Sequence, residues 1–324
     1  MSDATSTPTS RDPVHVPVNL DARARDAKAA VVAIGRNEGE RLRRCLESAK
    51  KSGALIVYVD SGSTDGSIDV AKSLDAIVWE LKNVPFTAAL ARNTGALGIL
   101  SKYPSIEFIQ FVDGDCEIDP NWIETAMAFL NKHPTIAVVC GRRRERFPDA
   151  TIYNKLCDME WNTPVGQAKS CGGDAMIRSK VFSQIGGFNP SVIAGEEPEM
   201  CVRIRQAGFD VWRLDAEMTL HDAAMTRFGQ WWKRNVRAGH AYAENYHRHG
   251  APPELMAKKS VISNYVWAAM FPLLPLLWIK IKTQGKSALY ATFVTLSKVP
   301  QAIGQLKFHF NRLTGKRQTI IEYK

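Results

Sequence analysis

The strongest structural signal in this chain is Phe108-Ile109-Gln110-Phe111-Val112-Asp113-Gly114-Asp115. Its apolar part is typical of a buried strand, and the carboxyl ends of such strands form the ligand-binding edge of α/β sheets. Because side chains alternate along an extended backbone, we expect Asp113 and Asp115 to point to the same side. Two carboxylates there suit a hard divalent cation shared with a phosphate, and Gly114 is expected to let a bulky ligand approach the backbone. The alternative for these residues is an ordinary turn.

Alternating strand and helix patterns surround this stretch, from residue 28 to about 215. We expect strands at 29–34, 55–59, 76–79, 108–112 and 136–140, and helices at 40–50, 67–74 and 88–100. Asp119 is expected to cap a further helix, with Pro120 as its first residue. Repeated β-α-β order predicts a parallel or mostly parallel sheet covered by helices.

Composition limits the class of protein. The 324 residues suffice for one α/β domain of roughly 200–250 residues with an appendage. A net charge of +9 favours phosphates or anionic lipids as partners. Nucleic acid is not expected, because no basic helix or aromatic RNA-binding motif stands out. The six cysteines lack CxxC spacing, which indicates reduced thiols in a cytosolic protein: Cys45, Cys116, Cys140, Cys157, Cys171 and Cys201.

The two ends of the chain differ from its centre. Residues 1–27 lack an apolar signal segment and are expected to form a flexible tail. Residues 28–250 are expected to form the main α/β domain. Within it, residues 226–249 interleave aromatic with basic side chains, which predicts an amphipathic helix. Residues 251–324 are expected to form a helical, basic C-terminal segment.

That C-terminal segment contains two apolar stretches, at 261–279 and 288–306. The first is barely long enough to span a bilayer and contains two prolines, and Lys280, Lys282 and Lys286 follow it. A span would carry these lysines outside, against the positive-inside tendency. A helical hairpin lying in the membrane interface accommodates both features and is the reading we favour. A true span and a soluble helical subdomain are the alternatives.

Acidic groups follow three successive predicted strands: Glu38, then Asp60, then Asp113 with Asp115. The loop after the second strand, Asp60-Ser61-Gly62-Ser63-Thr64-Asp65-Gly66, also provides Ser63 and Asp65 as candidate caps for the next helix. Capping explains one such loop. Three on the same edge of one sheet indicate a binding cleft, in which Asp60 is placed to accept a hydrogen bond from a base N–H.

These motifs together resemble family 2 glycosyltransferases, which have the GT-A nucleotide-sugar-binding fold. The resemblance covers about residues 28–240. It rests on Ile34-Gly35-Arg36-Asn37-Glu38, the Asp60 loop, Ala91-Arg92-Asn93-Thr94-Gly95, Phe111-Val112-Asp113-Gly114-Asp115, Gly172-Gly173-Asp174-Ala175-Met176, Gly186-Gly187-Phe188 and Gly195-Glu196-Glu197-Pro198-Glu199-Met200. It implies an α/β, Rossmann-like mixed sheet with a membrane-associated helical tail at its C-terminus.

On the donor side, the resemblance implies a nucleotide-diphosphate-sugar and Mg²⁺ or Mn²⁺. Asp60 would bind the nucleotide base, with Glu38 and Asp65 nearby. Asp113 and Asp115 would hold the metal, Asp115 as the closer ligand.

Other residues would serve the diphosphate and the acceptor. Arg92 would lie near the diphosphate; a helix-surface ion pair is the alternative. His221 would be a further metal or diphosphate ligand, unless it is structural. Asp174 would bind acceptor hydroxyls.

The attacking hydroxyl needs a base on the opposite face of the sugar. Glu197, in place of the more usual Asp, is the first candidate and Glu196 the second. The alternative is an acidic helix start favoured by the macrodipole. Direct attack would invert the anomeric centre.

Gln230-Trp231-Trp232-Lys233-Arg234 is reminiscent of the Gln-x-x-Arg-Trp motif of processive synthases, but in another order, which favours single additions. Trp231 and Trp232 would stack on sugars, anchor the helix at a membrane or pack in a core.

The sequence therefore predicts an inverting, metal-dependent glycosyltransferase at the cytoplasmic face of the membrane. Its acceptor would be a glycan or glycolipid, such as a lipid-linked unit of an exopolysaccharide or cell-envelope glycan. A membrane-surface protein that binds nucleotide-sugars with little or no catalysis is the alternative. A dinucleotide-binding oxidoreductase is disfavoured, because Gly35-Arg36-Asn37-Glu38-Gly39 is not a Gly-x-Gly-x-x-Gly turn.

Overall fold

The structure, a computed structural model, describes residues 14–16, 27–82 and 86–316. The strands are β1 (Val14–Val16), β2 (Ala29–Gly35), β3 (Leu55–Asp60), β4 (Ile77–Glu80), β5 (Phe108–Asp113), β6 (Cys116–Ile118), β7 (Ile136–Glu145), β8 (Gly166–Ala168), β9 (Ala175–Arg178) and β10 (Asp210–His221). The helices are α2 (Glu40–Lys51), α3 (Ser67–Ser73), α4 (Ala88–Lys102), α5 (Trp122–Lys132), α6 (Ile152–Trp161), α7 (Ser179–Gln184), α8 (Glu196–Gln206), α9 (Phe228–His249), α10 (Lys258–Ala269), η1 (Phe271–Leu273), α11 (Leu274–Thr283), α12 (Ala288–Leu296) and α13 (Lys298–Leu313).

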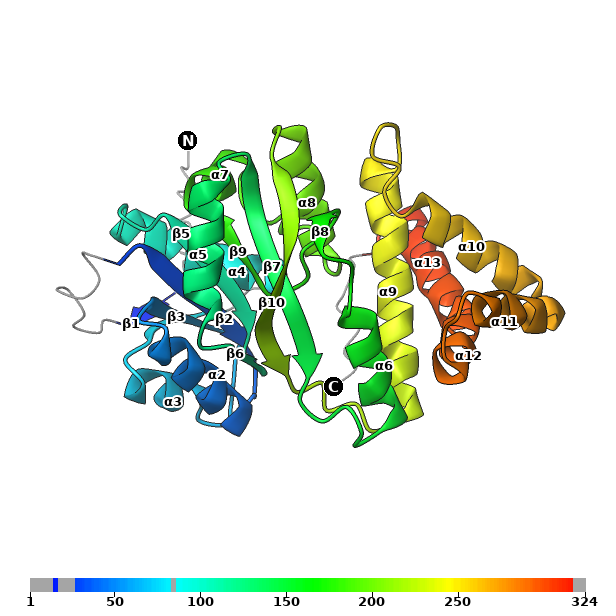
Figure 1. Ribbon diagram of the computed structural model, residues 1–324, viewed down its shortest axis with the longest axis horizontal. Helices are drawn as coiled ribbons and strands as arrows, with labels where there is room; N and C mark the ends of the chain where they lie inside the picture. Colours follow the sequence, from blue (N-terminus) through cyan, green and yellow to red (C-terminus); the bar gives the residue numbers. More distant parts are fainter. Residues whose placement is uncertain (1–13, 17–26, 83–85, 317–324) are drawn as a thin grey trace, which may run out of the picture.

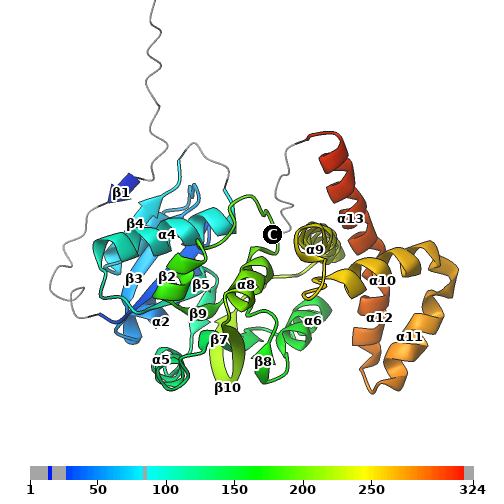
Figure 2. The same ribbon diagram turned by 90° about the horizontal axis from the view of Figure 1, so that it is seen from above.

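One mixed sheet organises the molecule, with strand order β1-β4-β3-β2-β5-β9-β7-β10-β6 and β8 added beside β10. Strands β4, β3, β2 and β5 run parallel, whereas β9 is antiparallel to both β5 and β7. Figure 2 shows α4 on one side of this sheet and α2 and α5 on the other. The predicted α/β mixed sheet is confirmed.

Most predicted elements form, with two differences near their ends. Helix α5 begins at Trp122, because Asp119 accepts a hydrogen bond from the Asn121 backbone and forms a turn before the helix (N···O 2.9 Å). Within the predicted tail, Val14–Val16 pair antiparallel with β4, so these residues are not a free tail; the other residues before 27 lie outside the described ones.

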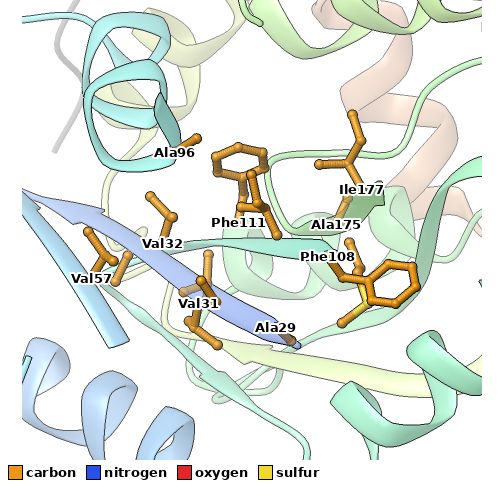
Figure 3. Packing of buried hydrophobic residues seen from close by; sticks show 14 of the residues in the cluster. Ala29, Val31, Val32, Val57, Ala96, Phe108, Phe111, Ala175 and Ile177 are labelled. Atoms are coloured by element: carbon orange, nitrogen blue, oxygen red, sulfur yellow. The ribbon is translucent and has the colours of Figure 1, made fainter. Parts of the chain in front are cut away.

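The core lies between the sheet and its helices (Figure 3). Phe111 of β5 packs against Phe182 and Phe188, with ring centroids 5.4 and 5.1 Å away. Helix α4 lies close to β2 and β3 because Gly95 faces them: a Cβ there would come within 2.6 Å of a Val32 methyl carbon. Gln110 is a polar residue of β5 that lies inside the core. Its side-chain oxygen accepts a hydrogen bond from the Trp122 indole N–H at 2.7 Å.

Strand register brings the predicted acidic loops to the same edge of the sheet. Asp60 lies opposite Gly35, and Asp113 lies opposite Ile34. Strand β2 has β3 on one side and β5 on the other, so the crevice at this switch in strand order opens among these loops. Gly114 is explained by the same packing, because a Cβ there would come within 3.1 Å of the Ile34 carbonyl oxygen. The close β2 backbone therefore leaves little room for a larger residue here, and the predicted approach of a ligand stays a prediction.

The C-terminal helices form a separate layer that packs on α9 (Figure 1). Helices α9 and α13 meet backbone to backbone at two glycines: a Cβ on Gly239 would lie 2.0 Å from the Gln301 oxygen, and one on Gly304 would lie 2.0 Å from the Val236 oxygen. Within the described part of the chain, no single helix is both long and apolar enough to cross a bilayer. Helix α10 and the segment 271–283, which bend by 99° at their junction, reach that length and hydropathy only as a pair.

Gly304→Ala is expected to lower the free energy of unfolding by about 1–3 kcal/mol, the usual cost of overpacking, since neither backbone at this crossing can yield without separating the helices. Gly229→Ala in α9 is the matched control, because nothing lies within 4 Å of a Cβ there. It should be neutral or stabilising through its helix propensity. Urea unfolding of both variants measures their free energies of unfolding. Equal values would show that the two helices can separate enough to accept a methyl group at Gly304.

Candidate active site

Asp60 ends β3 and is buried within its own loop. Its Oδ1 accepts a hydrogen bond from the Tyr58 hydroxyl at 2.9 Å, and its Oδ2 accepts from the backbone N–H groups of Gly62 and Ser63 at 2.9 and 2.8 Å. The carboxylate therefore shapes the loop at the carboxyl end of β3. Its predicted contact with a nucleotide base stays a prediction.

Asp65 joins the first two acidic loops. It accepts hydrogen bonds from the backbone N–H of Ser67, where α3 begins, and from that of Gly39. Burial acts to raise the pKa of Asp65, but these hydrogen bonds outweigh it and the pKa is lowered. The Asp65 side chain thus binds the first backbone N–H of α3, whose N-cap residue is Gly66, whereas Ser63 accepts from the Asn37 N–H. Glu38, in the neighbouring loop, pairs with Arg41 at 2.7 Å.

Arg92 connects the two halves of the cleft. It lies on α4, is 3% exposed, and donates from Nη2 to Asp113 Oδ1 at 2.8 Å and from Nη1 to Glu196 Oε1 at 2.7 Å. It is therefore a buried bridge and not a helix-surface ion pair. The Asp-Gly-Asp stretch and the start of α8 share this guanidinium, although 104 residues separate Arg92 from Glu196.

Arg143 is a site residue that sequence reasoning missed. Its Nη2 donates to Asp113 Oδ2 at 3.1 Å, and its guanidinium carbon lies 5.0 Å from the centre of the Trp161 ring. Asp113 is thus held between two arginines, as a phosphate-binding region requires. The available signal was the Arg142-Arg143-Arg144 run directly after the predicted strand at 136–140, which in the structure extends to Glu145.

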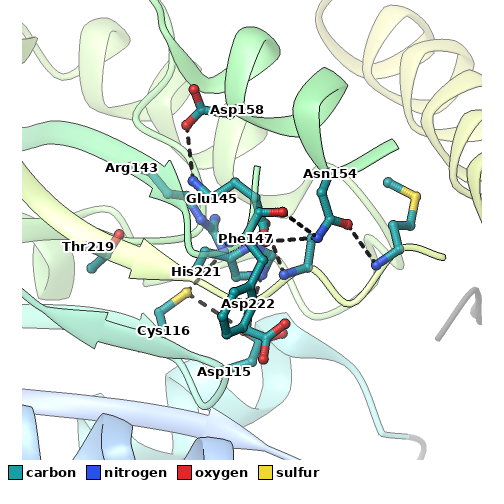
Figure 4. Close-up of polar contacts among 12 residues, drawn as sticks. Asp115, Cys116, Arg143, Glu145, Phe147, Asn154, Asp158, Thr219, His221 and Asp222 are labelled. Carbon is teal, nitrogen blue, oxygen red and sulfur yellow. Dashed lines mark hydrogen bonds and ion pairs between the residues drawn. The ribbon is translucent and has the colours of Figure 1, made fainter. Parts of the chain in front are cut away.

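Asp115 faces His221, the last residue of β10. The His221 Nε2 lies 3.3 Å from Asp115 Oδ1, and its Nδ1 lies 4.0 Å from Glu145 Oε2 (Figure 4). Strand register produces this row, because His221 lies opposite Cys116 on β6 and opposite Glu145 on β7. Burial, and then the charge of Arg143, lower the pKa of His221 to about 3, so its imidazole is neutral and keeps a lone pair.

Asp174 does not have the acceptor-facing position that was predicted for it. It is 0% exposed, and its oxygens accept hydrogen bonds from the Asp113 backbone N–H at 3.1 Å and from the Thr219 hydroxyl at 2.7 Å. Its Oδ2 also lies 3.4 Å from Arg143 Nε. The side chain therefore fixes Asp113 and Arg143 from behind. The pattern Gly172-Gly173-Asp174 gave no sign of this, because burial depends on strands distant in sequence.

Glu196 and Glu197 begin α8, and their environments differ. Glu196 is ion-paired with Arg92. Glu197 Oε1 accepts a hydrogen bond from the Cys171 backbone N–H and lies 3.3 Å from Cys201 Sγ. Burial raises the pKa of Glu197, and hydrogen bonds from Cys171 only partly offset it. A carboxylate with a raised pKa is the stronger base at neutral pH.

The aromatic pair on α9 lies mainly in a second core. Trp231 is 1% exposed and packs with Leu156, Cys157, Ala223 and Met225, while Trp232 packs against that cluster. Gln230 accepts hydrogen bonds from the backbone N–H groups that begin α9, and so closes a capping box. Core packing and capping therefore explain this motif in the structure.

A divalent cation fits the group around Asp115. The ligand atoms of Asp115, Cys116 and His221 all lie within 4.8 Å of one another. Burial raises the pKa of Cys116 well above its usual value, so the thiol stays protonated and leaves a carboxylate and an imidazole as donors. The Glu145 carboxylate lies behind the imidazole, 4.0 Å from its Nδ1, which is beyond hydrogen-bond distance. An imidazole in the set suits a transition-metal ion better than Mg²⁺, which prefers oxygen.

Comparisons with known proteins agree with this geometry. Residues 31–184 match the family model described as "Glycosyl transferase family 2". Among curated proteins, the glycosyltransferase AglE of Haloferax volcanii is 24% identical over 63% of this chain and 69% of its own length. The succinoglycan biosynthesis protein ExoA of Rhizobium meliloti is 24% identical over 68% and 70%.

Solved structures show the same fold. The mannosyltransferase PcManGT of Pyrobaculum calidifontis, in complex with GDP-Man and Mn²⁺, aligns with a TM-score of 0.62 at 17% identity over 86% of this chain and 87% of that one. Glucosyl-3-phosphoglycerate synthase of Mycobacterium tuberculosis, with Mn²⁺ and UDP, aligns with a TM-score of 0.51 at 15% identity, over 71% and 83%.

Proposed function

We propose, from the premise that this chain is a family 2 glycosyltransferase, that it transfers a sugar from a nucleotide-diphosphate donor to a glycan hydroxyl with inversion. The solved relatives bind GDP-Man or UDP together with Mn²⁺, which supports a donor and metal of the same kind here. Glu38, Asp60 and Asp65 would lie on the nucleotide side. The diphosphate would lie by Asp113, Asp115 and Arg143.

The observation that carries the proposal is the bridge made by Arg92. A leaving diphosphate gains negative charge, and fixed cations in a water-poor site stabilise that charge strongly. Arg92 and Arg143 meet this need from either side of Asp113. Because the same Arg92 contacts Glu196, the acidic start of α8 lies within one side chain of the departing group.

The metal site would be formed by Asp115 and His221, with Asp113 beside them. A bound divalent ion would neutralise charge on the diphosphate. The chain itself contributes the fixed geometry: Asp174 holds Asp113 through its backbone N–H, and Glu145 lies behind His221.

Glu197 is the proposed general base, with Glu196 as the second candidate. Glu197 has no arginine partner among the ion pairs of the described residues, and burial raises its pKa. It would take the proton of the acceptor hydroxyl as that oxygen attacks the anomeric carbon from the side opposite the diphosphate. One direct displacement of this kind inverts the configuration.

Purified protein should be tested by thermal shift with UDP, GDP, CDP and dTDP, each with and without Mn²⁺. A ligand that binds only the native state raises the melting temperature by mass action. We expect one nucleotide to give a shift that requires Mn²⁺, which would name the donor class. If none of the four shifts the melting temperature, the donor proposal is wrong.

We also propose that the enzyme acts at the cytoplasmic face of a membrane, on a lipid-linked acceptor. Exposed apolar side chains line the bent segment of α10, η1 and α11: Ile262, Val266, Met270, Phe271, Leu273, Leu276 and Ile279. Lys280, Lys282 and Lys286 follow this surface. Apolar anchors beside lysines suit an interface with anionic lipid. The prolines at the bend agree with a hairpin that lies on the bilayer.

The chain should sediment with vesicles rich in phosphatidylglycerol more than with phosphatidylcholine vesicles, and less so at high salt. The double variant Phe271→Ser/Leu276→Ser should weaken binding at least tenfold, because two such side chains each contribute about 1.5–3 kcal/mol when fully buried. Leu97→Ser is the control: Leu97 is 46% exposed but lies on α4. Equal binding by both variants would contradict the proposal.

A further inference from the structure

A cavity of about 310 Å³ lies between α6, α9 and the C-terminal helices, apart from the cleft described above. This volume is within the range of about 300–1,000 Å³ that small-molecule sites occupy. Its lining residues are Leu156, Glu160, Trp231, Asn235, Tyr242, Ser260, Tyr290, Phe293, Val294, Ser297, Lys298 and Gln301. Helix α6 separates it from the catalytic cleft, and both views show α12 and α13 beside α9 there (Figures 1 and 2).

The lining combines aromatic rings with fixed polar groups. Trp231 and Phe293 meet edge to face, with centroids 5.0 Å apart. On the polar side, Gln301 donates to Asn235 Oδ1 at 2.9 Å, and Asn235 in turn donates to the Trp231 carbonyl at 2.9 Å. The amides are thus oriented by the protein before any ligand arrives, which lowers the entropic cost of binding one.

The charges of the lining favour a neutral ligand. Lys298 lies 3.1 Å from Asn264 Oδ1, and Glu160 pairs with Arg234 at 2.6 Å. A phosphate in the cavity would therefore face the Glu160 carboxylate. A hydrocarbon chain would cover the hydroxyl groups of the lining without hydrogen-bonding to them, which costs free energy in a buried place. Aromatic faces with amide and hydroxyl groups suit a polyhydroxylated ring.

The cavity is next to the reaction centre along α6. Glu160 lines the cavity, and the following residue, Trp161, has its ring centre 4.6 Å from that of His221. Consecutive helical residues point in directions about 100° apart, so α6 presents one face to each site. The cavity therefore lies beside the reaction centre, across α6.

We propose that this cavity is a subsite for a sugar unit of the acceptor glycan, set back from the residue that receives the transferred sugar. This assignment rests on the proposed function for the identity of its ligand as an acceptor. The binding of a neutral sugar ring there is a separate physical claim, and it can be measured without donor, metal or turnover.

The experiment uses the full chain and saturation-transfer NMR with the methyl glycosides of glucose, galactose, mannose, rhamnose and N-acetylglucosamine. Ser260→Trp fills the cavity, and Asn235→Leu/Gln301→Leu removes its oriented amides as a pair. Gln184→Leu, at an exposed position on α7, is the matched control. Melting temperatures establish that each variant is folded, and the Mn²⁺-dependent nucleotide shift reports separately on the catalytic cleft.

At least one glycoside is expected to bind the wild type and the control, and to bind both cavity variants at least tenfold more weakly. The nucleotide shift should not change in any of them. Binding of no glycoside at millimolar concentration, or binding that both cavity variants retain, would overturn the assignment. Sugar binding in the cavity without any nucleotide shift would refute the proposed donor chemistry and leave the subsite standing.

Discussion

Glu197→Gln is expected to lower sugar transfer by about 10²–10⁴-fold, the usual contribution of a general base, while nucleotide binding stays intact. The amide keeps the shape of the side chain, and its carbonyl oxygen still accepts the hydrogen bond from the Cys171 N–H. Only the ability to take a proton is lost. Initial rates with donor and acceptor, together with the Mn²⁺-dependent thermal shift, separate catalysis from binding.

The same substitution has a predictable effect on stability. Burial raises the pKa of Glu197 in the folded state. A raised folded pKa means that this carboxyl contributes stability below its unfolded pKa, and that the contribution is lost as pH rises through the folded value. At neutral pH the variant should therefore melt at the same temperature as the wild type or higher. This advantage should disappear in acid.

Glu196→Gln is the matched control, because it breaks an ion pair with Arg92 and should lower the melting temperature at neutral pH. Transfer by the wild type should also decline in acid as Glu197 is protonated. Full transfer by Glu197→Gln would remove Glu197 from the mechanism. If Glu196→Gln then proved inactive and stable, the base would be Glu196.

Asp115→Asn is expected to abolish the Mn²⁺-dependent thermal shift with nucleotide and to lower transfer by about 10²–10³-fold, a typical loss when one charge-stabilising group is removed. The amide cannot supply the negative oxygen that a hard cation prefers. His221, 3.3 Å away, would remain as a single neutral ligand. Mn²⁺ titration by electron paramagnetic resonance measures the site directly, without turnover.

Asp149→Asn is the control for Asp115→Asn, since the Asp149 side chain is 87% exposed and lies outside the cleft. It should leave Mn²⁺ affinity unchanged. If Asp115→Asn bound Mn²⁺ as tightly as this control, the metal site would have to lie elsewhere. Unchanged nucleotide shifts in both variants would lead to the same conclusion.

Local patterns predicted the parallel half of the sheet and the acidic loops at its edge. Strands β2, β3 and β5 are largely apolar, with Gln110 as a polar residue inside β5, and an acidic loop follows each strand. Sequence order alone therefore placed Asp60 and Asp113 together. The interleaved aromatic and basic residues of α9 likewise predicted a helix there. These features depend on neighbours within a few positions.

The other half of the sheet, in which parallel and antiparallel pairings are mixed, could not be predicted in this way. The His221–Cys116–Glu145 row depends on the register of β10, β6 and β7, which no local pattern encodes. For the same reason Arg143 was missed, and Asp174 was placed on the acceptor side although the structure buries it. The partner of a side chain on a neighbouring strand depends on the tertiary structure. The pattern of charges or glycines within one segment does not predict it.

The glycine crossing of α9 and α13 has a mechanical consequence. No side chains separate the two backbones at this crossing, so no rotamer change can absorb a movement of one helix relative to the other. A tilt of the C-terminal helices should therefore move α9 as well. Helix α9 in turn contacts the α8 start, because Asn245 donates to the Gly195 carbonyl at 3.1 Å. If the C-terminal helices bind a surface, the angle at which they do so would then fix the orientation of the catalytic domain relative to that surface.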